Sequence, residues 1–474
     1  MSTLPVESDG KARPTLKRAL RFRDLTLFYI VSGLSVRWVA TAAAAGASTL
    51  LVWVFALCGF FVPLAACVLE LSSRYPAEGG LYVWTREAYG DFSGFIAAWT
   101  YWMSNLPYFP AVLYFGAGSV LFAFGAHGEH LSADSRYYLL FALFWLGLIT
   151  VTNILGVNAG KWLTNVSSLG GLIPISLLIM LGIVSAVRFG SATSFAWTGL
   201  IPYPSLKNAI FWSTIFFAFG GCEAGSFMGE EIENPRKVIP RALLVGGGIF
   251  AAAYIAGTAA LLVALPSSAV HGVDGFMRGM MALCNRLSVA WLAIPIALLL
   301  GLNAVGGAAA FLSSTSRLPF VAGIDRYLPR VFGHVHPRFQ TPWVAIGCYG
   351  LAGMIVALLS QAGTSVRGAY DVLVSMSIIA YFIPYLFLFA SMIRLQREAA
   401  GPEVIRVWGG KKVAILLAAI GLMTTSLTIV LSVIPGEDET NKTLAVAKVL
   451  ISTAVLIGAG VAVFVVAEMR KRRG

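Results

Sequence analysis

Residues 216–226 read Phe-Phe-Ala-Phe-Gly-Gly-Cys-Glu-Ala-Gly-Ser, an apolar stretch broken by a glycine pair and a carboxylate. Free backbone groups in the middle of a membrane span need a partner or a water-lined cavity, and a carboxylate there is functional by default. Residues 28–38 form a second interrupted stretch, Phe-Tyr-Ile-Val-Ser-Gly-Leu-Ser-Val-Arg-Trp. Interrupted helices at matching places in two halves of a chain indicate the substrate site of a secondary transporter. Close helix packing is the alternative explanation of the glycine pair.

The composition of the whole chain is that of a membrane protein. Of its 474 residues, 58% are hydrophobic and 12% are charged, whereas ordinary globular domains carry about a quarter charged residues. This excludes a soluble enzyme, a nucleic-acid-binding module and a disordered protein. The net charge of +12 does not indicate nucleic acid, because the basic residues sit at the ends of apolar runs and not along one face. Neither the cysteines nor the histidines show a metal-binding spacing, so no metal and no organic cofactor is expected.

Twelve apolar runs, each long enough to cross a bilayer as a helix, lie between charged or Gly/Pro-rich breaks. Their length and the lack of period-two alternation predict an all-α integral membrane protein. The runs cover residues 25–45, 48–72, 92–125, 137–156, 162–187, 208–229, 240–265, 288–316, 342–360, 370–394, 412–434 and 444–468. The interrupted runs are the first and the sixth, which fits a five-helix repeat, inverted, followed by two C-terminal helices. Pro107 and Pro110 predict a kink or tilt in the third run.

The distribution of basic residues predicts the orientation. Of the Lys and Arg residues, 25 fall in connections on one side of the twelve-span topology and eight on the other, and Arg37 falls inside a span. Because basic loops stay in the cytoplasm, both termini are expected there, in a multi-pass protein of the cell membrane. The predicted parts are a basic N-terminal tail (1–23), a ten-helix transporter core (24–394), a cytoplasmic loop (395–411), two C-terminal helices (412–468) and a cytoplasmic tail (469–474). Segment 266–287 is expected to be an extracellular loop with a short interfacial helix.

Three stretches of the chain resemble the amino acid–polyamine–organocation (APC) transporter superfamily. Residues 217–241, with Phe-Ala-Phe-Gly-Gly-Cys-Glu and then Gly-Glu-Glu-Ile-Glu-Asn-Pro-Arg-Lys-Val-Ile-Pro-Arg, resemble its sixth-span signature. Residues 74–90, which begin Arg-Tyr-Pro-Ala-Glu-Gly-Gly, resemble its loop between spans two and three. Residues 316–329, Ser-Arg followed by Asp-Arg-Tyr-Leu-Pro, resemble the segment after span eight. The resemblance covers roughly residues 20–470 and implies a leucine-transporter-like fold that works by alternating access.

The resemblance also implies where substrate binds, and Arg37 is the main departure from the family. Members usually carry a glycine-rich break in span one, whose N–H groups hold the substrate carboxylate, and matching on residues 31–33 puts Arg37-Trp38-Val39 at that break. Three roles for Arg37 remain open: a bidentate contact to a substrate carboxylate, an ion pair with Glu223, or a position that faces a cavity or snorkels.

The predicted substrate-binding residues lie on spans one, three, six and eight. Phe217 matches the aromatic residue that closes over substrate in the family's arginine/agmatine antiporters, Asn105 matches a third-span polar contact, and Phe311 matches an eighth-span aromatic residue. An aromatic residue that only packs is the alternative at each aromatic position. The predicted set is Ser32, Gly33, Ser35, Arg37, Asn105, Phe217, Gly220, Gly221, Glu223 and Phe311.

The charged motif after span six predicts an inner gate. Glu230, Glu231 and Glu233 are expected to face Arg236, Lys237 and Arg241 as a latch of ion pairs, and a solvated charged loop is the alternative. The stretch Pro76-Ala-Glu-Gly-Gly predicts a turn, followed by an aromatic amphipathic helix in the membrane interface.

The coupling ion remains open between H⁺ and Na⁺, and a Na⁺-independent exchanger is equally consistent with the sequence. Gly171 stands where some bacterial members have a span-five lysine that titrates. The hydroxyls of Ser313 and Ser314 are candidate Na⁺ ligands, or else bond the preceding helical turn.

The leading hypothesis is a secondary transporter, not an enzyme, for an amino acid or a related small carboxylate. Its partners are then the small-molecule substrate and the lipid bilayer, with no nucleic acid, and the oligomeric state stays open. A polyamine or organocation transporter is the alternative within transport; Arg37 opposes it, and Ile30 stands where the plant polyamine-uptake branch has a glutamate. A membrane-embedded enzyme would need a nucleophile–base or metal set in the spans, and a sensor would need an appended soluble domain, for which neither tail is long enough.

Overall fold

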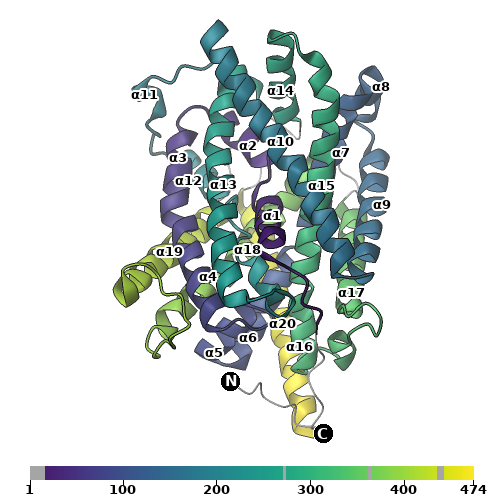
Figure 1. The fold of residues 1–474 in the computed structure, drawn as a ribbon, viewed down its shortest axis with the longest axis vertical. Helices are drawn as coiled ribbons and strands as arrows, with labels where there is room; N and C mark the ends of the chain where they lie inside the picture. The colour runs from purple at the N-terminus through teal and green to yellow at the C-terminus, as the bar shows by residue number, and fades with distance from the viewer. Residues whose placement is uncertain (1–15, 271–273, 361–365, 435–441, 474) are drawn as a thin grey trace.

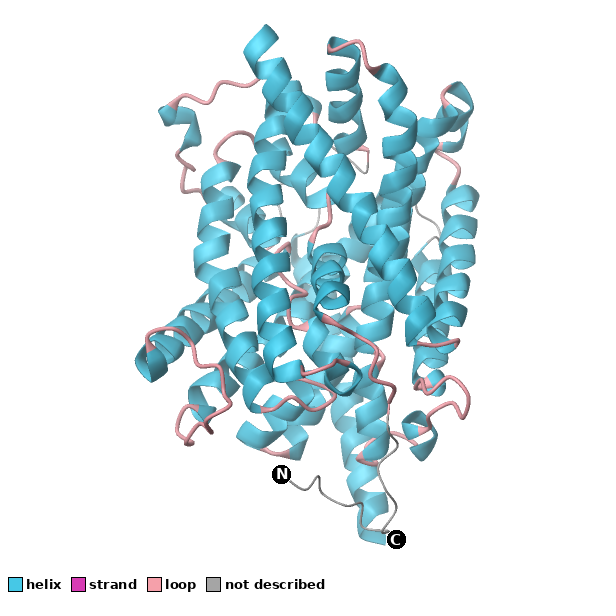
Figure 2. Cartoon of the chain, in the orientation of Figure 1, coloured by secondary structure: helices cyan, strands magenta, loops and turns pink. Residues whose placement is uncertain are grey.

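The computed structural model describes residues 16–270, 274–360, 366–434 and 442–473, and its regular elements in these ranges are helices (Figure 2). Ten described helices are long and apolar enough to cross a membrane, and two shorter apolar helices, Asn208–Phe217 and Ala380–Leu395, coincide with the sixth and tenth predicted spans. The predicted all-α, multi-span fold class is therefore confirmed. Residues 1–15 of the predicted N-terminal tail and residues 271–273 of the predicted loop 266–287 lie outside the described residues.

Three of the first five spans consist of more than one helix. They are α1 (Phe22–Gly33) with α2 (Arg37–Ala44), α3 (Thr49–Ala56) joined through a π-helical turn to α4 (Val62–Arg74), α6 (Asp91–Ser104) with α7 (Tyr108–Leu121), α9 (Ser135–Ile154), and α10 (Val157–Phe189). Shorter helices in the connections are α5 (Leu81–Tyr89), α8 (Ala126–Leu131) and α11 (Trp197–Leu200).

The remaining spans begin with a second broken helix. They are α12 (Leu206–Phe217) followed by the 3₁₀ helix η3 (Ala224–Glu231), α13 (Pro235–Ala264), α15 (Ala293–Thr315), α17 (Trp343–Ser360), α18 (Val366–Leu395), α19 (Gly410–Val433) and α20 (Lys442–Arg473). The connections contain α14 (Gly275–Arg286), which falls in the predicted loop 266–287, and α16 (Arg317–Ile324).

The bundle surrounds its first helix. Helix α1 lies at the centre of the view and packs against α10, α13 and α15 (Figure 1). Helices α8, α11 and α14 lie at one end of the molecule, and α5, α16 and the C-terminus lie at the other (Figure 1). The two C-terminal spans pack on the outside of this core, α19 against α18 and α4, and α20 against α6. The first break is therefore held deep inside the bundle.

The third span is bent where its prolines predict. Helix α6 ends at Ser104, and α7 begins at Tyr108 with Pro107 as its N-cap residue. Proline has no N–H to donate and its ring clashes with a continuing helix, so the hydrogen-bond ladder ends before it. The bend leaves Ser104 and Asn105 at the junction, on the wall of the cavity described below.

Helix α5, predicted to lie at the membrane interface, is packed against the bundle. The side chains of Tyr82 and Trp84 are fully buried, and α5 contacts α6 and α18. Gly80 makes this possible: it has a φ of +39°, and a Cβ atom built on it would lie 2.3 Å from Oγ of Ser226. Contacts with α6 and α18 therefore cover the aromatic side chains of α5.

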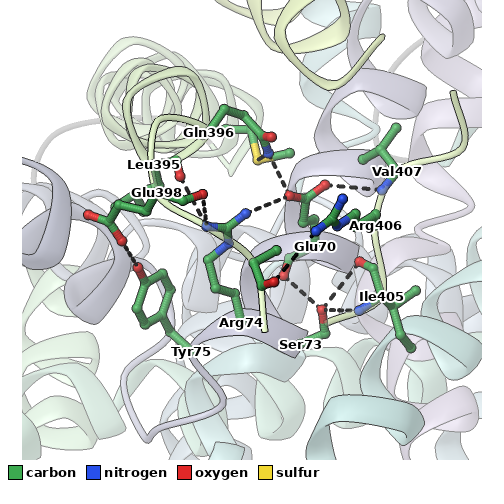
Figure 3. A network of polar contacts seen from close by, with 12 residues as sticks. Glu70, Ser73, Arg74, Tyr75, Leu395, Gln396, Glu398, Ile405, Arg406 and Val407 are labelled. Carbon is green, nitrogen blue, oxygen red and sulfur yellow. Dashed lines mark hydrogen bonds and ion pairs between the residues drawn. The ribbon is translucent and has the colours of Figure 1, made fainter. Parts of the chain in front are cut away.

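A polar network ties the connection after α18 to the end of α4 (Figure 3). The buried carboxylate of Glu70 accepts hydrogen bonds from the side chains of Arg74 (3.0 Å) and Gln396 and from the backbone N–H of Val407 (3.0 Å). Arg74 also donates to the carbonyl of Leu395 at 3.0 Å. Because every partner of Glu70 donates to it, the carboxylate is stabilised in its charged form, and the segment that joins α18 to α19 is held against the core.

Candidate functional site

The first helix break lies between α1 and α2, three residues before the position inferred from the resemblance. The non-helical residues are Leu34, Ser35 and Val36, and Arg37 is the first residue of α2. The expectation that Arg37-Trp38-Val39 forms the break is therefore wrong, because the break lies three residues earlier in the sequence. Gly33 ends α1 at a close approach, since a Cβ atom on it would lie 2.5 Å from the ring of Phe250. Arg37 consequently starts a helix, with the positive end of that helix's dipole beside it.

The second break lies between α12 and η3, as its sequence predicts. Residues 218–223 form turns. Gly221 has a φ of +102° and a Cβ atom there would lie 2.9 Å from the ring of Phe311, so a side chain would be strained and crowded. Its backbone N–H donates to the hydroxyl of Tyr385 at 3.2 Å. The glycine pair thus lies in an unwound segment. Gly220 also packs closely against the rings of Tyr381 and Tyr385.

One tyrosine of α13 bridges the two breaks. The hydroxyl of Tyr254 accepts the backbone N–H of Ser35 at 3.1 Å and donates to the carbonyl of Gly33. The carbonyl of Ala218, in the second break, lies 3.3 Å from the same hydroxyl. Polar backbone groups freed by unwinding must find partners inside the protein, and this fully buried side chain is one such partner.

A small cavity lies between the two breaks and brings most of the predicted site together. Its volume is about 30 Å³, enough for one water molecule, whereas sites for small molecules measure about 300–1,000 Å³. Eight of the ten predicted substrate-binding residues line it, namely Ser32, Gly33, Ser35, Arg37, Asn105, Phe217, Gly220 and Phe311. Gly221 and Glu223 are not on its surface, although Tyr381, on its wall, contacts both Gly220 and Glu223.

The guanidinium of Arg37 is buried at this cavity without an anion. Arg37 is 5% exposed, and its Nε and Nη1 atoms have no hydrogen-bond partner among the described residues. Its charge lies 4.8 Å from the ring centroid of Trp38 and 5.5 Å from that of Tyr108, and such contacts stabilise a cation only in part. No ion pair joins it to Glu223 or to any other described carboxylate. Of the three predicted roles, pairing with Glu223 is therefore not the arrangement of this structure.

Glu223 is held by a cluster of three tyrosines. Its Oε1 atom accepts hydrogen bonds from the hydroxyls of Tyr101, Tyr385 (2.8 Å) and Tyr381 (3.4 Å). Its Oε2 atom is buried and has no partner among the described residues. One carboxylate oxygen of Glu223 is therefore bonded to tyrosine hydroxyls, whereas the other has no partner among the described residues.

Several lining residues were not in the predicted set: Trp38, Ser104, Tyr108, Ala218 and Tyr381. Trp38 and Phe217 form an edge-to-face pair, with ring centroids 5.5 Å apart, and Phe217 packs in the same way on Tyr381 at 4.8 Å. Tyrosine hydroxyls inside apolar runs were the available signal, because a buried hydroxyl needs a partner. That signal does not say which of many tyrosines face the breaks.

Three of the charged residues after span six, Glu231, Glu233 and Arg236, form ion pairs with other parts of the chain. Glu231 is fully buried and receives the Arg317 guanidinium at 2.6 Å, while Glu233 pairs with Arg21 at 3.1 Å. Arg236 pairs with Glu403. Of the predicted latch of Glu230, Glu231 and Glu233 against Arg236, Lys237 and Arg241, the pairings of Glu231, Glu233 and Arg236 are therefore wrong. Side chains that are adjacent in the sequence point in different directions at the end of a helix. Each therefore pairs with an opposite charge from a distant part of the chain.

Glu78, Glu231 and Arg317 form a buried group, the gate cluster, at the end of the molecule that contains α5 and α16. Arg317 lies 3.8 Å from Glu78 Oε1 as well as 2.6 Å from Glu231, and Glu78 accepts the backbone N–H of Glu230 at 2.9 Å. Burial, reinforced by the neighbouring charge of Glu231, holds the pKa of Glu78 well above its usual range. Two buried carboxylates thus share one guanidinium.

The N-terminal segment covers the gate cluster. The backbone N–H groups of Ala19 and Leu20 donate to the carbonyl of Glu231, both at 3.0 Å, and that of Glu233 donates to the carbonyl of Leu20 at 2.9 Å. These bonds lay residues 16–20 along the chain that leaves η3. The cavity is therefore separated from this end of the molecule by several layers of side chains.

The serines proposed as ion ligands lie away from the cavity. Ser314 Oγ bonds the carbonyl of Phe311 at 3.4 Å, one turn earlier in the helix. Ser313 lines a separate small cavity together with Asp24, Lys161 and Asn165, and Lys161 lies 3.6 Å from Asp24. Among the described residues no three His, Cys, Asp or Glu side chains group as metal ligands would.

Comparisons with known proteins agree on one family. The family model described as "Amino acid permease" matches residues 22–459. The chain is 27% identical to the serine/threonine exchanger SteT of Bacillus subtilis, over 79% of this chain and 81% of that protein. It is 23% identical to the probable agmatine/putrescine antiporter AguD of Lactococcus lactis, over 86% of this chain and 88% of that protein. The crystal structure of MhsT in complex with L-phenylalanine has the same fold, with a TM-score of 0.64 and 15% identity over 89% of this chain and all of that one.

Proposed function

Because the chain belongs to the amino acid permease family, we propose that this transporter is a secondary carrier that moves an amino acid or a related small carboxylate by alternating access. Its substrate site is the cavity between the two helix breaks. The breaks lie where interrupted helices of secondary transporters bind substrate, near the middle of the span.

The observation that carries this proposal is the buried, unpaired guanidinium of Arg37. A guanidinium stays charged in a protein, and a buried charge without a partner is strongly unfavourable. Arg37 lines the cavity, and its Nε and Nη1 groups have no partner among the described residues. A carboxylate matches the planar fork of arginine. The positive end of the α2 dipole acts in the same direction. A substrate carboxylate would therefore supply the anionic partner that the guanidinium of Arg37 lacks.

A transporter of polyamines or other organic cations is the competing proposal, and its support is the similarity to a probable agmatine/putrescine antiporter. The charge on the cavity wall opposes it. Arg37 is the ionised side chain among the lining residues, and Glu223 lies behind Tyr381 with one oxygen already bonded to three hydroxyls. An amine without a carboxylate would meet a cation with no adjacent anion.

Binding needs the aromatic wall to move. A cavity of about 30 Å³ is smaller than any amino acid. Phe217 and Trp38, packed edge to face, close the cavity on the side of α2 and α12, and Phe217 is only half-buried. We take this pair as the outer gate. The gate cluster, with Glu230 and the Arg236–Glu403 pair beside it, is the inner gate, and the N- and C-terminal tails lie on the cytoplasmic side with it.

A proton is the proposed coupling ion, with Glu223 as its site. The unpartnered Oε2 atom of this buried carboxylate is one tyrosine away from the substrate cavity, so protonation can change the position of Tyr381. Sodium has less support, because the Ser314 hydroxyl already bonds its own helix and Ser313 faces another cavity. Replacing Glu223 by Gln keeps an acceptor for the tyrosines and should make flux independent of external pH.

The experiment that tests the function is a thermal-shift screen of the purified protein against amino acids, simple carboxylates and polyamines. A ligand that binds only the folded state raises the melting temperature by mass action. Parent protein and Arg37→Gln are compared, and hits are followed as uptake or exchange in proteoliposomes. Stabilisation of the parent by carboxylates, lost in Arg37→Gln, supports the proposal. Stabilisation by putrescine or agmatine but by no carboxylate would replace it with the polyamine alternative.

A further inference from the structure

A second and much larger pocket lies at the C-terminal end of the molecule, apart from the substrate cavity. It has a volume of about 970 Å³ and lies between residues 324–330, which follow α16, and one face of α20. It shares no lining residue with the substrate cavity. Figure 1 shows α20 running past α16 towards the C-terminus.

One wall of this pocket is apolar and belongs to a membrane span. Ala462, Val463, Val466 and Ala467 line it, and their spacing puts them on one face of a helix. They lie within the apolar stretch Thr453–Arg472, which is long enough to cross a membrane.

A neighbouring face of α20 fixes this wall in place. Phe464 packs against Phe92 and Phe95 of α6, and the indole of Trp99 donates to the carbonyl of Leu456 at 2.9 Å. The helix therefore leans on α6, and Phe464 also stacks on Tyr327 with ring centroids 4.9 Å apart. The face that contains Ala462 and Val466 is left to line the pocket.

The rim of the pocket is basic. Arg326, Arg330, Arg470 and Lys471 line it together with a single acid, Asp325. Asp325 already accepts the guanidinium of Arg86 at 2.6 Å and the hydroxyl of Tyr82 at 2.6 Å. Glu468 partly offsets the positive charge of the rim, since its carboxylate lies 3.6 Å from Nζ of Lys471.

Two side chains of the rim are positioned to meet an anion. Lys471 Nζ lies 3.3 Å above the ring of Tyr327, which holds the ammonium over the pocket floor. Arg470 is exposed and makes no ion pair with a described residue. A ligand with a negative charge at one end and hydrocarbon at the other is complementary to this rim and wall.

We infer that this pocket binds one anionic phospholipid, with the phosphodiester of its headgroup at Arg330, Arg470 and Lys471 and an acyl chain along Ala462 and Val466. Basic residues just outside a span attract anionic lipid headgroups, and guanidinium groups hold phosphate oxygens with paired hydrogen bonds. The apolar wall selects a lipid over a free phosphate, because burying hydrocarbon adds affinity that the headgroup alone lacks. The volume of about 970 Å³ accommodates a headgroup and the first part of a chain.

The experiment is native mass spectrometry of the full-length protein in detergent, titrated with phosphatidylglycerol or with phosphatidylcholine of the same chains. The parent is expected to retain phosphatidylglycerol in preference to phosphatidylcholine. Arg330→Gln/Arg470→Gln should lower the retained phosphatidylglycerol on the order of tenfold, from the loss of two charges at the headgroup. The matched control Lys411→Gln/Lys412→Gln removes two exposed lysines at the start of α19 and should change retention little.

Two further arms separate a lipid from a free phosphate. Ala462→Trp fills the acyl wall without changing charge and should also lower retention, whereas Val455→Trp, on an exposed part of α20 outside the pocket, should not. Glycerol 3-phosphate, which has the headgroup phosphate but no chain, should not displace the lipid. Equal retention of the two lipids by the parent overturns the inference, as does equal loss in the Arg330/Arg470 and Lys411/Lys412 variants. Complete displacement by glycerol 3-phosphate overturns it in favour of a phosphate site.

Discussion

At the scale of single residues, the arrangement around Arg37 carries the proposal that the cavity binds a carboxylate. Arg37 is 5% exposed, and its guanidinium lies over the rings of Trp38 and Tyr108. Cation–π contacts contribute about 0.5–2 kcal/mol, which offsets only part of the several kcal/mol that burying an ion costs. The remaining deficit favours an anionic ligand at this place.

The first prediction follows from this deficit. Arg37→Met should keep or raise the melting temperature of the ligand-free protein, because it removes a buried charge that has no partner to leave behind. Uptake should be abolished. Arg37→Lys should weaken substrate binding by roughly 10- to 100-fold, since one charge-assisted hydrogen bond contributes about 1.5–3 kcal/mol. The measurements are melting curves with and without ligand, and flux into proteoliposomes. A fall in ligand-free stability of several kcal/mol in Arg37→Met would reveal a protein partner and refute a substrate role.

At the scale of helices, the two breaks act as one unit because Tyr254 connects them. Its hydroxyl meets the backbone of Ser35 and Gly33 in one break and of Ala218 in the other. A movement of one half-helix therefore changes the hydrogen bonding of the other. Transport by alternating access requires such coupling between the two broken spans.

The second prediction is that Tyr254→Phe reduces stability by about 1–3 kcal/mol, the usual cost of leaving a buried backbone group unsatisfied, and also lowers substrate affinity. Tyr349→Phe is the matched control. Tyr349 is equally buried, and its hydroxyl donates to the carbonyl of Trp102 at 2.9 Å, outside the two breaks. Melting temperature and ligand binding are measured for both variants. If the two variants lose affinity equally, the bridge has no special role.

The gate cluster gives the third prediction, a dependence of stability on pH. Glu78 has a pKa well above its usual range, chiefly because it is buried. A carboxyl group whose pKa is raised on folding adds stability below its ordinary pKa, and this stability is lost as the pH rises through the raised value. The parent should therefore lose stability between the ordinary pKa of glutamate and the raised one. Glu78→Gln should flatten this loss.

The measurement is a series of melting curves across that pH window for the parent and Glu78→Gln. Glu398→Gln serves as the control, because Glu398 is an exposed carboxylate that accepts the hydroxyl of Tyr75 at 2.7 Å. Its removal should leave the slope with pH near that of the parent. Identical slopes in the parent and Glu78→Gln would show that Glu78 keeps one charge state throughout.

At the scale of the whole molecule, the charged connections divide between its two ends. Arg74, Arg86 and Arg317 lie at the end that contains α5 and α16, whereas α8 and α14 lie at the opposite end (Figure 1). Positively charged connections remain on the cytoplasmic side. The proposed orientation therefore places the gate cluster and the lipid pocket inside the cell.

The fourth prediction tests this orientation by cysteine labelling in intact cells. In a background in which the exposed Cys58 and Cys348 are replaced by alanine, Ser132→Cys next to α8 should react with a membrane-impermeant maleimide. Gly401→Cys, in the connection between α18 and α19, should react only after the cells are opened. Labelling of position 401 from outside would invert the topology.

The sequence by itself determined the class, the spans and most of the residues that line the cavity between the breaks. Hydrocarbon admits only helices of about twenty apolar residues, so twelve spans could be read from run lengths. The glycine pair and carboxylate at residues 220–223 located the second break, because unwinding inside a membrane needs those residue types.

Only the tertiary structure decided how these residues meet. In the structure the first break lies at residues 34–36, and Arg37 makes no ion pair with Glu223. Glu231 pairs with Arg317, which is 86 positions away in the sequence. The tertiary structure also gathered tyrosines from α6, α13 and α18 around the breaks. The physical reason is that a buried charge or hydroxyl takes whichever complementary group the packing brings within about 3 Å. That choice depends on the directions of whole helices, which the local order of residues does not encode.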